Sequence, residues 1–177
     1  ANAATVLLAN AIEFKNLSTT IDAKGDQDTV NGFAGVDWTL GGTNSVTSTN
    51  GYTFNNIEIV DVASQTLNGT AGADAFTVNS AAEVGADSIV FNNVAIVAAD
   101  AGSDSVTTTG VGADLTGTEN ELKAAGIIFK DVETASLDGQ ALAGSDLTDT
   151  FSLQSASLAA NAATVLLANA IEFKNLS

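Results

Sequence analysis

The sequence predicts an all-β chain that folds as a parallel β-solenoid (β-helix), in which coils of backbone stack along one axis. Two observations lead to this prediction. A long repeat returns to its own beginning, and a shorter repeat inside it combines alternating apolar residues with a polar corner. Internal repeats of roughly 20–50 residues are typical of stacked architectures. A string of small β-sandwich domains is the alternative, because two short repeats also add up to one such domain.

The long repeat sets the expected organisation of the chain. Residues 1–18 recur without a change as residues 160–177, an offset of 159. We therefore expect one continuous solenoid segment over 1–177, made of a tandem unit (1–159) and the first 18 residues of the next unit (160–177). The two identical segments should occupy equivalent places one unit apart.

Four diverged sub-repeats make up the unit, each marked by a Phe, two polar residues and an aliphatic residue. They begin near Phe14, Phe54, Phe91 and Phe129, and the next cycle begins near Phe173. Apolar residues stand two positions before and three positions after each Phe. This pattern predicts an inward-facing strand, a tight corner and a second inward-facing strand.

The corner position of the sub-repeats holds residue types that tolerate left-handed backbone. It reads Asn16, Asn56, Asn93, Asp131 and Asn175. Each sub-repeat of about 40 residues can supply two coils, so we expect eight coils per unit, a rise of roughly 38 Å, and Phe rings stacked in register.

Short helical excursions are expected beside the stack. Residues 80–83 and 118–121 both match the S/T-x-x-E capping box that begins many helices. Residues 161–170 align with the second of these segments and carry the same expectation.

Composition excludes several classes of function. The chain has 5 Lys, 21 acidic residues and no Arg, His, Cys, Met or Pro, giving a formal net charge of -16. A nucleic-acid groove needs a basic stripe, and binding to anionic membranes needs basic clusters. Without His or Cys, the usual nucleophile–base pairs and zinc sites cannot form. We therefore expect no enzyme, no nucleic-acid partner and no membrane insertion.

One motif suggests calcium. Residues 69–77, GTAGADAFT, match the nonapeptide G-G-x-G-x-D-x-U-x except at Thr70, and weaker matches surround three other Asp residues. The motif resembles hemolysin-type (RTX) calcium-binding repeats of secreted bacterial proteins, which implies calcium held by backbone carbonyls and carboxylates. The candidate ligands are Asp28, Asp74, Asp104 and Asp149. The alternative, which the wide spacing of the matches favours, is that these residues cap turns ahead of an inward Val or Phe.

The broader pattern of aromatic, N-[IVL], Gly-led turn and D-[TSA]-[FV] resembles repeats of giant secreted bacterial surface proteins and adhesins with β-solenoid regions. That resemblance implies a location on the bacterial cell surface or in the extracellular matrix. We expect a structural repeat that forms a stiff rod or filament, with copies of itself as head-to-tail partners. The alternative is an adhesin module whose side face binds a glycan or a protein receptor, with Trp38 or Tyr52 exposed for stacking.

Overall fold

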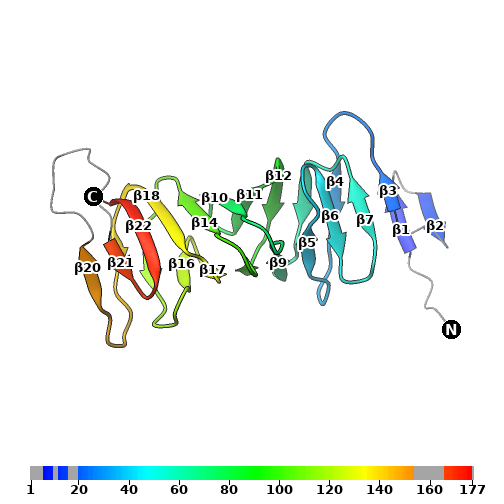
Figure 1. Cartoon of the computed structure of the whole chain (residues 1–177). Helices are drawn as coiled ribbons and strands as arrows, with labels where there is room; N and C mark the ends of the chain where they lie inside the picture. Colours follow the sequence, from blue (N-terminus) through cyan, green and yellow to red (C-terminus); the bar gives the residue numbers. More distant parts are fainter. Residues whose placement is uncertain (1–5, 10–11, 16–19, 154–165, 177) are drawn as a thin grey trace.

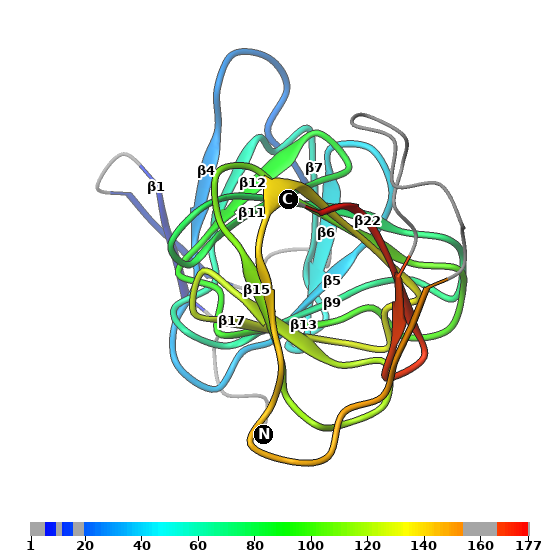
Figure 2. The ribbon, with the colours of Figure 1, turned by 90° about the vertical axis from the view of Figure 1, so that its left-hand side faces the viewer.

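The computed structural model describes residues 6–9, 12–15, 20–153 and 166–176, and this part of the chain is all β with no helix. Most of its strands form an elongated stack (Figure 1), and Figure 2 looks along the axis of that stack. The predicted β-solenoid is confirmed.

Two ten-stranded sheets form the stack among the described residues. Sheet I contains, in spatial order, β3 (Thr20–Asp22), β7 (Thr53–Asn55), β6 (Ser45–Ser48), β5 (Trp38–Leu40), β9 (Thr66–Asn68), β13 (Ile96–Ala98), β17 (Ile127–Lys130), β16 (Leu122–Ala124), β15 (Ala113–Leu115) and β19 (Leu142–Ala143). Sheet II contains β4 (Thr29–Asn31), β8 (Ile59–Asp61), β12 (Ile89–Asn92), β11 (Glu83–Ala86), β10 (Ala75–Ser80), β14 (Ser105–Thr108), β18 (Thr134–Gln140), β22 (Ile171–Leu176), β21 (Leu166–Ala168) and β20 (Phe151–Leu153).

The chain alternates between the sheets, and neighbouring coils pair in parallel, as β4 with β8 and β9 with β13. At regular intervals the chain also turns back and adds a three-stranded antiparallel meander to one sheet. These meanders are β5–β6–β7 and β15–β16–β17 in sheet I, and β10–β11–β12 and β20–β21–β22 in sheet II. Successive meanders therefore fall on opposite sheets.

The meanders occupy the segments for which helices were expected, so the predicted helical excursions are wrong. Ser80 ends β10 and Glu83 begins β11, with Ala82 between them at φ 59°. Residues 118–121 lie in the connection from β15 to β16, where Asn120 has φ 55°. A left-handed residue reverses the chain, whereas a helix needs consecutive right-handed residues. Of the third segment, 161–165 lies outside the described residues and 166–170 forms β21 and a turn.

The meanders also change the length of the unit. The described part of residues 20–176 places ten strands in each sheet, where eight coils would place eight, because every sub-repeat contributes an antiparallel return. At about 4.8 Å per strand, the unit rises roughly 48 Å.

The Phe residues of the sub-repeats enter one continuous core but do not stack on one another. Phe54 and Phe129 lie in sheet I, whereas Phe91 and Phe173 lie in sheet II. Their strand neighbours are aliphatic or small, so the expected Phe column is wrong; the side chain of Phe14 lies outside the described residues. Buried residues from Val30 to Phe173 form a single cluster, which excludes a string of separate sandwiches.

The polar corners are confirmed where the structure describes them, and Asn16 lies outside that part. The corner residues Asn56, Asn93, Asp131 and Asn175 all have φ between 52° and 58°. The three Asn residues also join neighbouring coils through their side-chain amides. Asn56 donates to Asp22 Oδ1 at 2.6 Å, Asn93 donates to Asp61 Oδ1 at 3.0 Å, and Asn175 donates to Ser136 Oγ at 2.8 Å.

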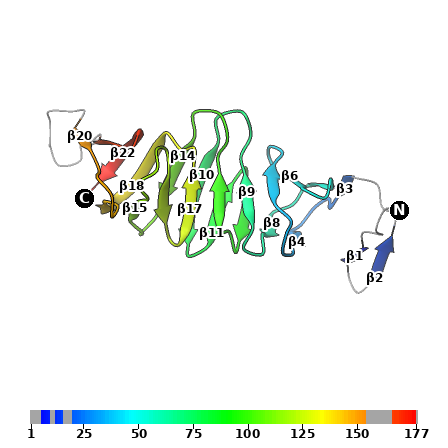
Figure 3. The same ribbon diagram turned by 90° about the horizontal axis from the view of Figure 1, so that it is seen from below.

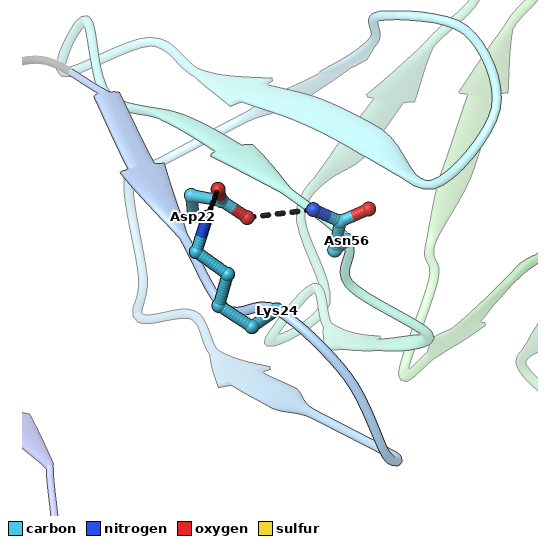
Figure 4. Close-up of polar contacts among 3 residues, drawn as sticks. All are labelled: Asp22, Lys24 and Asn56. Atoms are coloured by element: carbon cyan, nitrogen blue, oxygen red, sulfur yellow. Dashed lines mark hydrogen bonds and ion pairs between the residues drawn. The ribbon is translucent and has the colours of Figure 1, made fainter.

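Figure 4 shows the corner bond from Asn56 to Asp22, where Lys24 also pairs with the Asp22 carboxylate. Hydrogen bonds from Lys24 and Asn56 lower the pKa of Asp22 below its ordinary value. The corner therefore joins β3 to β7 through a charged side chain at the surface.

The two identical sequence segments form the same hairpin in different surroundings. In β1 (Val6–Ala9) and β2 (Ile12–Lys15), Leu7 lies opposite Phe14, and in β21 and β22 Leu166 lies opposite Phe173. β22 pairs in parallel with β18, whereas β1 and β2 form a two-stranded sheet of their own. Figures 1 and 3 both show that sheet beyond β3, at the opposite end from β22.

Candidate assembly interface

Asp74 and Asp149 close equivalent turns. The Asp74 carboxylate accepts hydrogen bonds from the backbone N–H and the hydroxyl of Thr70 at 2.6 Å and 3.1 Å. Asp149 accepts the same pair from Ser145, at 2.7 Å and 2.9 Å. Gly69 and Gly144 stand directly before Thr70 and Ser145. A Cβ on Gly69 would lie 2.7 Å from Asp74 Oδ2, and a Cβ on Gly144 would lie 2.8 Å from Asp149 Oδ2, which explains the Gly in both motifs.

A column of acidic side chains then links one coil to the next where strands enter sheet II. The backbone N–H of Asp74 donates to Asp104 Oδ1 at 2.7 Å, and that of Asp104 donates to Glu133 Oε2 at 2.7 Å. The backbone N–H of Asp28 donates to Glu58 Oε2 at 3.0 Å. Each of these carboxylates therefore accepts a hydrogen bond from a backbone N–H of the neighbouring coil.

Sequence reasoning missed Glu58 and Glu133 in this column. Both occupy the same position of the gapless alignment between the second and fourth sub-repeats, four residues after the Phe. An acidic residue repeated immediately before an inward strand was the signal that could have found them.

Asp104 is the fully buried carboxylate of the column. Its Oδ2 atom has no hydrogen-bond partner among the described residues. Burial raises the pKa of Asp104, and the nearby carboxylates of Glu133, Asp74 and Asp100 raise it further, against the lowering effect of the Asp74 amide.

The four candidate calcium ligands fall at different coils. Asp74 is joined to Asp104 through its amide, while Asp28 and Asp149 lie near opposite ends of the stack. Within the described residues, no three acidic, His or Cys side chains form a group that could hold a metal. The geometry favours turn closure and coil linkage, and calcium binding stays a prediction.

The C-terminal end of the stack exposes residues whose aligned counterparts are buried. Phe76 is 1% exposed, whereas Phe151 at the same motif position is 49% exposed. β14 pairs with β10 beside Phe76, but β20, which carries Phe151, is the last strand of sheet II. Leu142 in the edge strand β19 is likewise less buried than its counterpart Leu67. Within the described residues, no further coil pairs with β19 or β20 at this end.

The opposite end of the stack carries Asp28, the counterpart of Asp104. β3 and β4 are the first strands of the two sheets. The Oδ2 atoms of Asp28 and Asp104 are both buried with no hydrogen-bond partner among the described residues, whereas Oδ1 of Asp104 accepts the Asp74 amide. Within the described stack, no coil supplies an amide to the Asp28 carboxylate as Asp74 does to Asp104.

The side face does not offer the aromatic residues considered for glycan stacking. Trp38 is 3% exposed and packs its ring against Phe54, with centroids 5.8 Å apart. Tyr52 is half-buried against the core.

No family model, no curated protein and no solved structure matches this chain. Among the described residues, no helix has the length and hydropathy needed to span a membrane.

Proposed function

We propose that this chain is a non-enzymatic, extracellular structural repeat of a bacterial surface or matrix, and that it builds a stiff rod by head-to-tail stacking. The observation that carries the proposal is the contrast between Phe151 and Phe76, which differ in exposure because one lacks the coil that covers the other. An open sheet edge with exposed apolar side chains pairs readily with a matching edge. The next repeat supplies that match.

The interior pairings specify how two copies would meet. β13 lies between β9 and β17, and β3 corresponds to β13, so β3 of an incoming copy would pair in parallel with β19. β14 lies between β10 and β18, and β4 corresponds to β14, so β4 would pair with β20. This register places Ile21 beside Leu142 and Val30 beside Phe151.

The acidic column would continue across the same joint. Asp149 corresponds to Asp74, and Asp28 corresponds to Asp104. The backbone N–H of Asp149 in one copy would donate to Asp28 Oδ1 in the next, as Asp74 does to Asp104 at 2.7 Å. A contact of this head-to-tail kind does not close into a ring and therefore gives an open filament.

Net charge sets the conditions for stacking. Copies that each carry a formal charge of -16 repel one another, and salt screens that repulsion. Stacking should therefore strengthen as ionic strength rises. The charge also keeps rods from adhering side by side.

Substitution at the exposed end tests the proposal. Phe151→Asp places a charge in the joint, so we expect the mass measured by light scattering after size-exclusion chromatography to fall to that of single chains. Thr107→Asp is the control, because it adds the same charge to an exposed position of β14 in the middle of the stack. Single chains at all concentrations and salt levels for the unsubstituted protein would contradict the proposal.

A further inference from the structure

We infer that the joint between copies forms by hairpin exchange, in which residues 6–15 of the incoming copy replace β21 and β22 of the preceding copy beside β18. This inference rests on the proposed head-to-tail stacking. It begins from two hairpins of identical sequence that share the same register. Among the described strands, β21–β22 belongs to a ten-stranded sheet, whereas β1–β2 pairs with no further strand.

The seat is defined by the pairing of β22 with β18. In that parallel pair Thr134 lies beside Glu172, Ala135 beside Phe173 and Ser136 beside Lys174. The offset of 159 makes residues 13–15 the same residue types in the same order as residues 172–174. The incoming hairpin can therefore place the same residue types beside Thr134, Ala135 and Ser136.

Stacking brings both hairpins to the same place. With β3 and β4 of the incoming copy on β19 and β20, the strand that leads into β3 belongs beside β18, as β12 leads into β13. Interior corners such as 93–95 join such strands through three residues, and residues 16–19 separate β2 from β3. The two hairpins therefore compete for one seat.

Connection length favours the incoming hairpin. Four residues (16–19) separate β2 from β3, whereas twelve residues (154–165) separate β20 from β21. A shorter connection holds a segment at a higher effective concentration near its seat. The two hairpins have the same sequence and so make the same local contacts beside β18. The shorter connection, together with the direct path from β2 into β3, therefore favours the incoming hairpin over β21 and β22. Exchange of identical elements is also a low-cost route to association.

Paired cysteines in the full-length chain test the exchange, because the sequence contains no Cys of its own. Glu13→Cys with Thr134→Cys should give a ladder of covalent oligomers on oxidation, resolved by non-reducing gel electrophoresis. Glu172→Cys with Thr134→Cys is the matched control, because these positions are neighbours within one copy before exchange. An internally linked, folded control monomer shows that the substitutions are tolerated and the cysteines can react.

The outcomes separate the exchange from the stacking it rests on. A ladder that forms only when Glu13→Cys and Thr134→Cys are both present supports the exchange. Oligomers detected by light scattering with no covalent ladder would overturn the exchange and keep the stacking. Single chains in both measurements would overturn both.

Discussion

Asp104 lies in surroundings that disfavour its charge. Its side chain is fully buried, Oδ2 has no partner among the described residues, and burial together with Glu133, Asp74 and Asp100 raises its pKa. The folded chain therefore binds this proton at a higher pH than the unfolded chain does. The free energy of unfolding that this group contributes falls as pH rises from its unfolded pKa through its raised folded pKa.

Asp104→Asn should remove that loss of stability. The Asn Oδ1 atom can still accept the Asp74 amide, which lies 2.7 Å from the present acceptor. We expect the midpoint of thermal unfolding to rise by about 2–4 °C at pH 7 and to change little at pH 3, where Asp104 is already protonated. Thermal melts followed by circular dichroism across this range measure the effect. Asp26→Asn, at an exposed position, is the control; a lower midpoint for Asp104→Asn at pH 7 would refute the account of Asp104.

Among the elements, the polar corners depend on left-handed backbone. Asn93 has φ 56°, and its side-chain amide donates to Asp61 on the neighbouring coil at 3.0 Å. For an L-residue with a Cβ, this conformation costs about 1–2 kcal/mol unless its side chain compensates, whereas Gly adopts it freely. The corner therefore combines a backbone preference with a bond between coils.

Two substitutions separate these contributions. Asn93→Ala should lower the free energy of unfolding by about 1–2 kcal/mol, because it loses both the bond and the tolerance for positive φ. Asn93→Gly should cost less than about 1 kcal/mol, because it loses only the bond. Chemical denaturation measures both, with Asn92→Ala in the adjacent strand β12 as the control. Equal losses for Ala and Gly would show that backbone conformation is not what selects Asn here.

The elements also show which parts of the fold could be predicted from sequence. The inward residues around Phe91 and the corner at Asn93 could be predicted from the sequence. Apolar residues alternate up to the Phe and resume shifted by one residue, a pattern that indicates two inward-facing strands joined by a tight corner. The meanders could not, because an antiparallel return carries the same period-two pattern as a forward coil. Ser80 and Glu83 mimic a capping box although they flank a turn with Ala82 at φ 59°.

In the candidate site, local contacts could be predicted from the sequence, but contacts between coils could not. The turn-closing role of Asp74 and Asp149 could be predicted from local sequence, since both ends of each bond lie within five residues. The link from Asp74 to Asp104 spans 30 residues and depends on the register of the coils. Only the structure could show that Asp28 and Asp149 lie near the two ends of this column.

At the scale of the whole molecule, the proposed function makes the unit one segment of a longer stack. Sheet I opens with β3 and ends with β19, and sheet II opens with β4 and ends with β20. In the proposed stack, β3 of one copy pairs with β19 of the preceding copy, and β4 pairs with β20. Each of these first strands supplies the pairing partner that the last strand of the same sheet does not have among the described residues.

The axial repeat of the assembled rod tests this central claim most directly. Electron microscopy of filaments should show a repeat of roughly 48 Å along the axis, because ten strands at about 4.8 Å each come from one unit. The density should run through the joints without a gap. Separated globular beads, or a continuous rod with a clearly different axial repeat, would contradict stacking in this register.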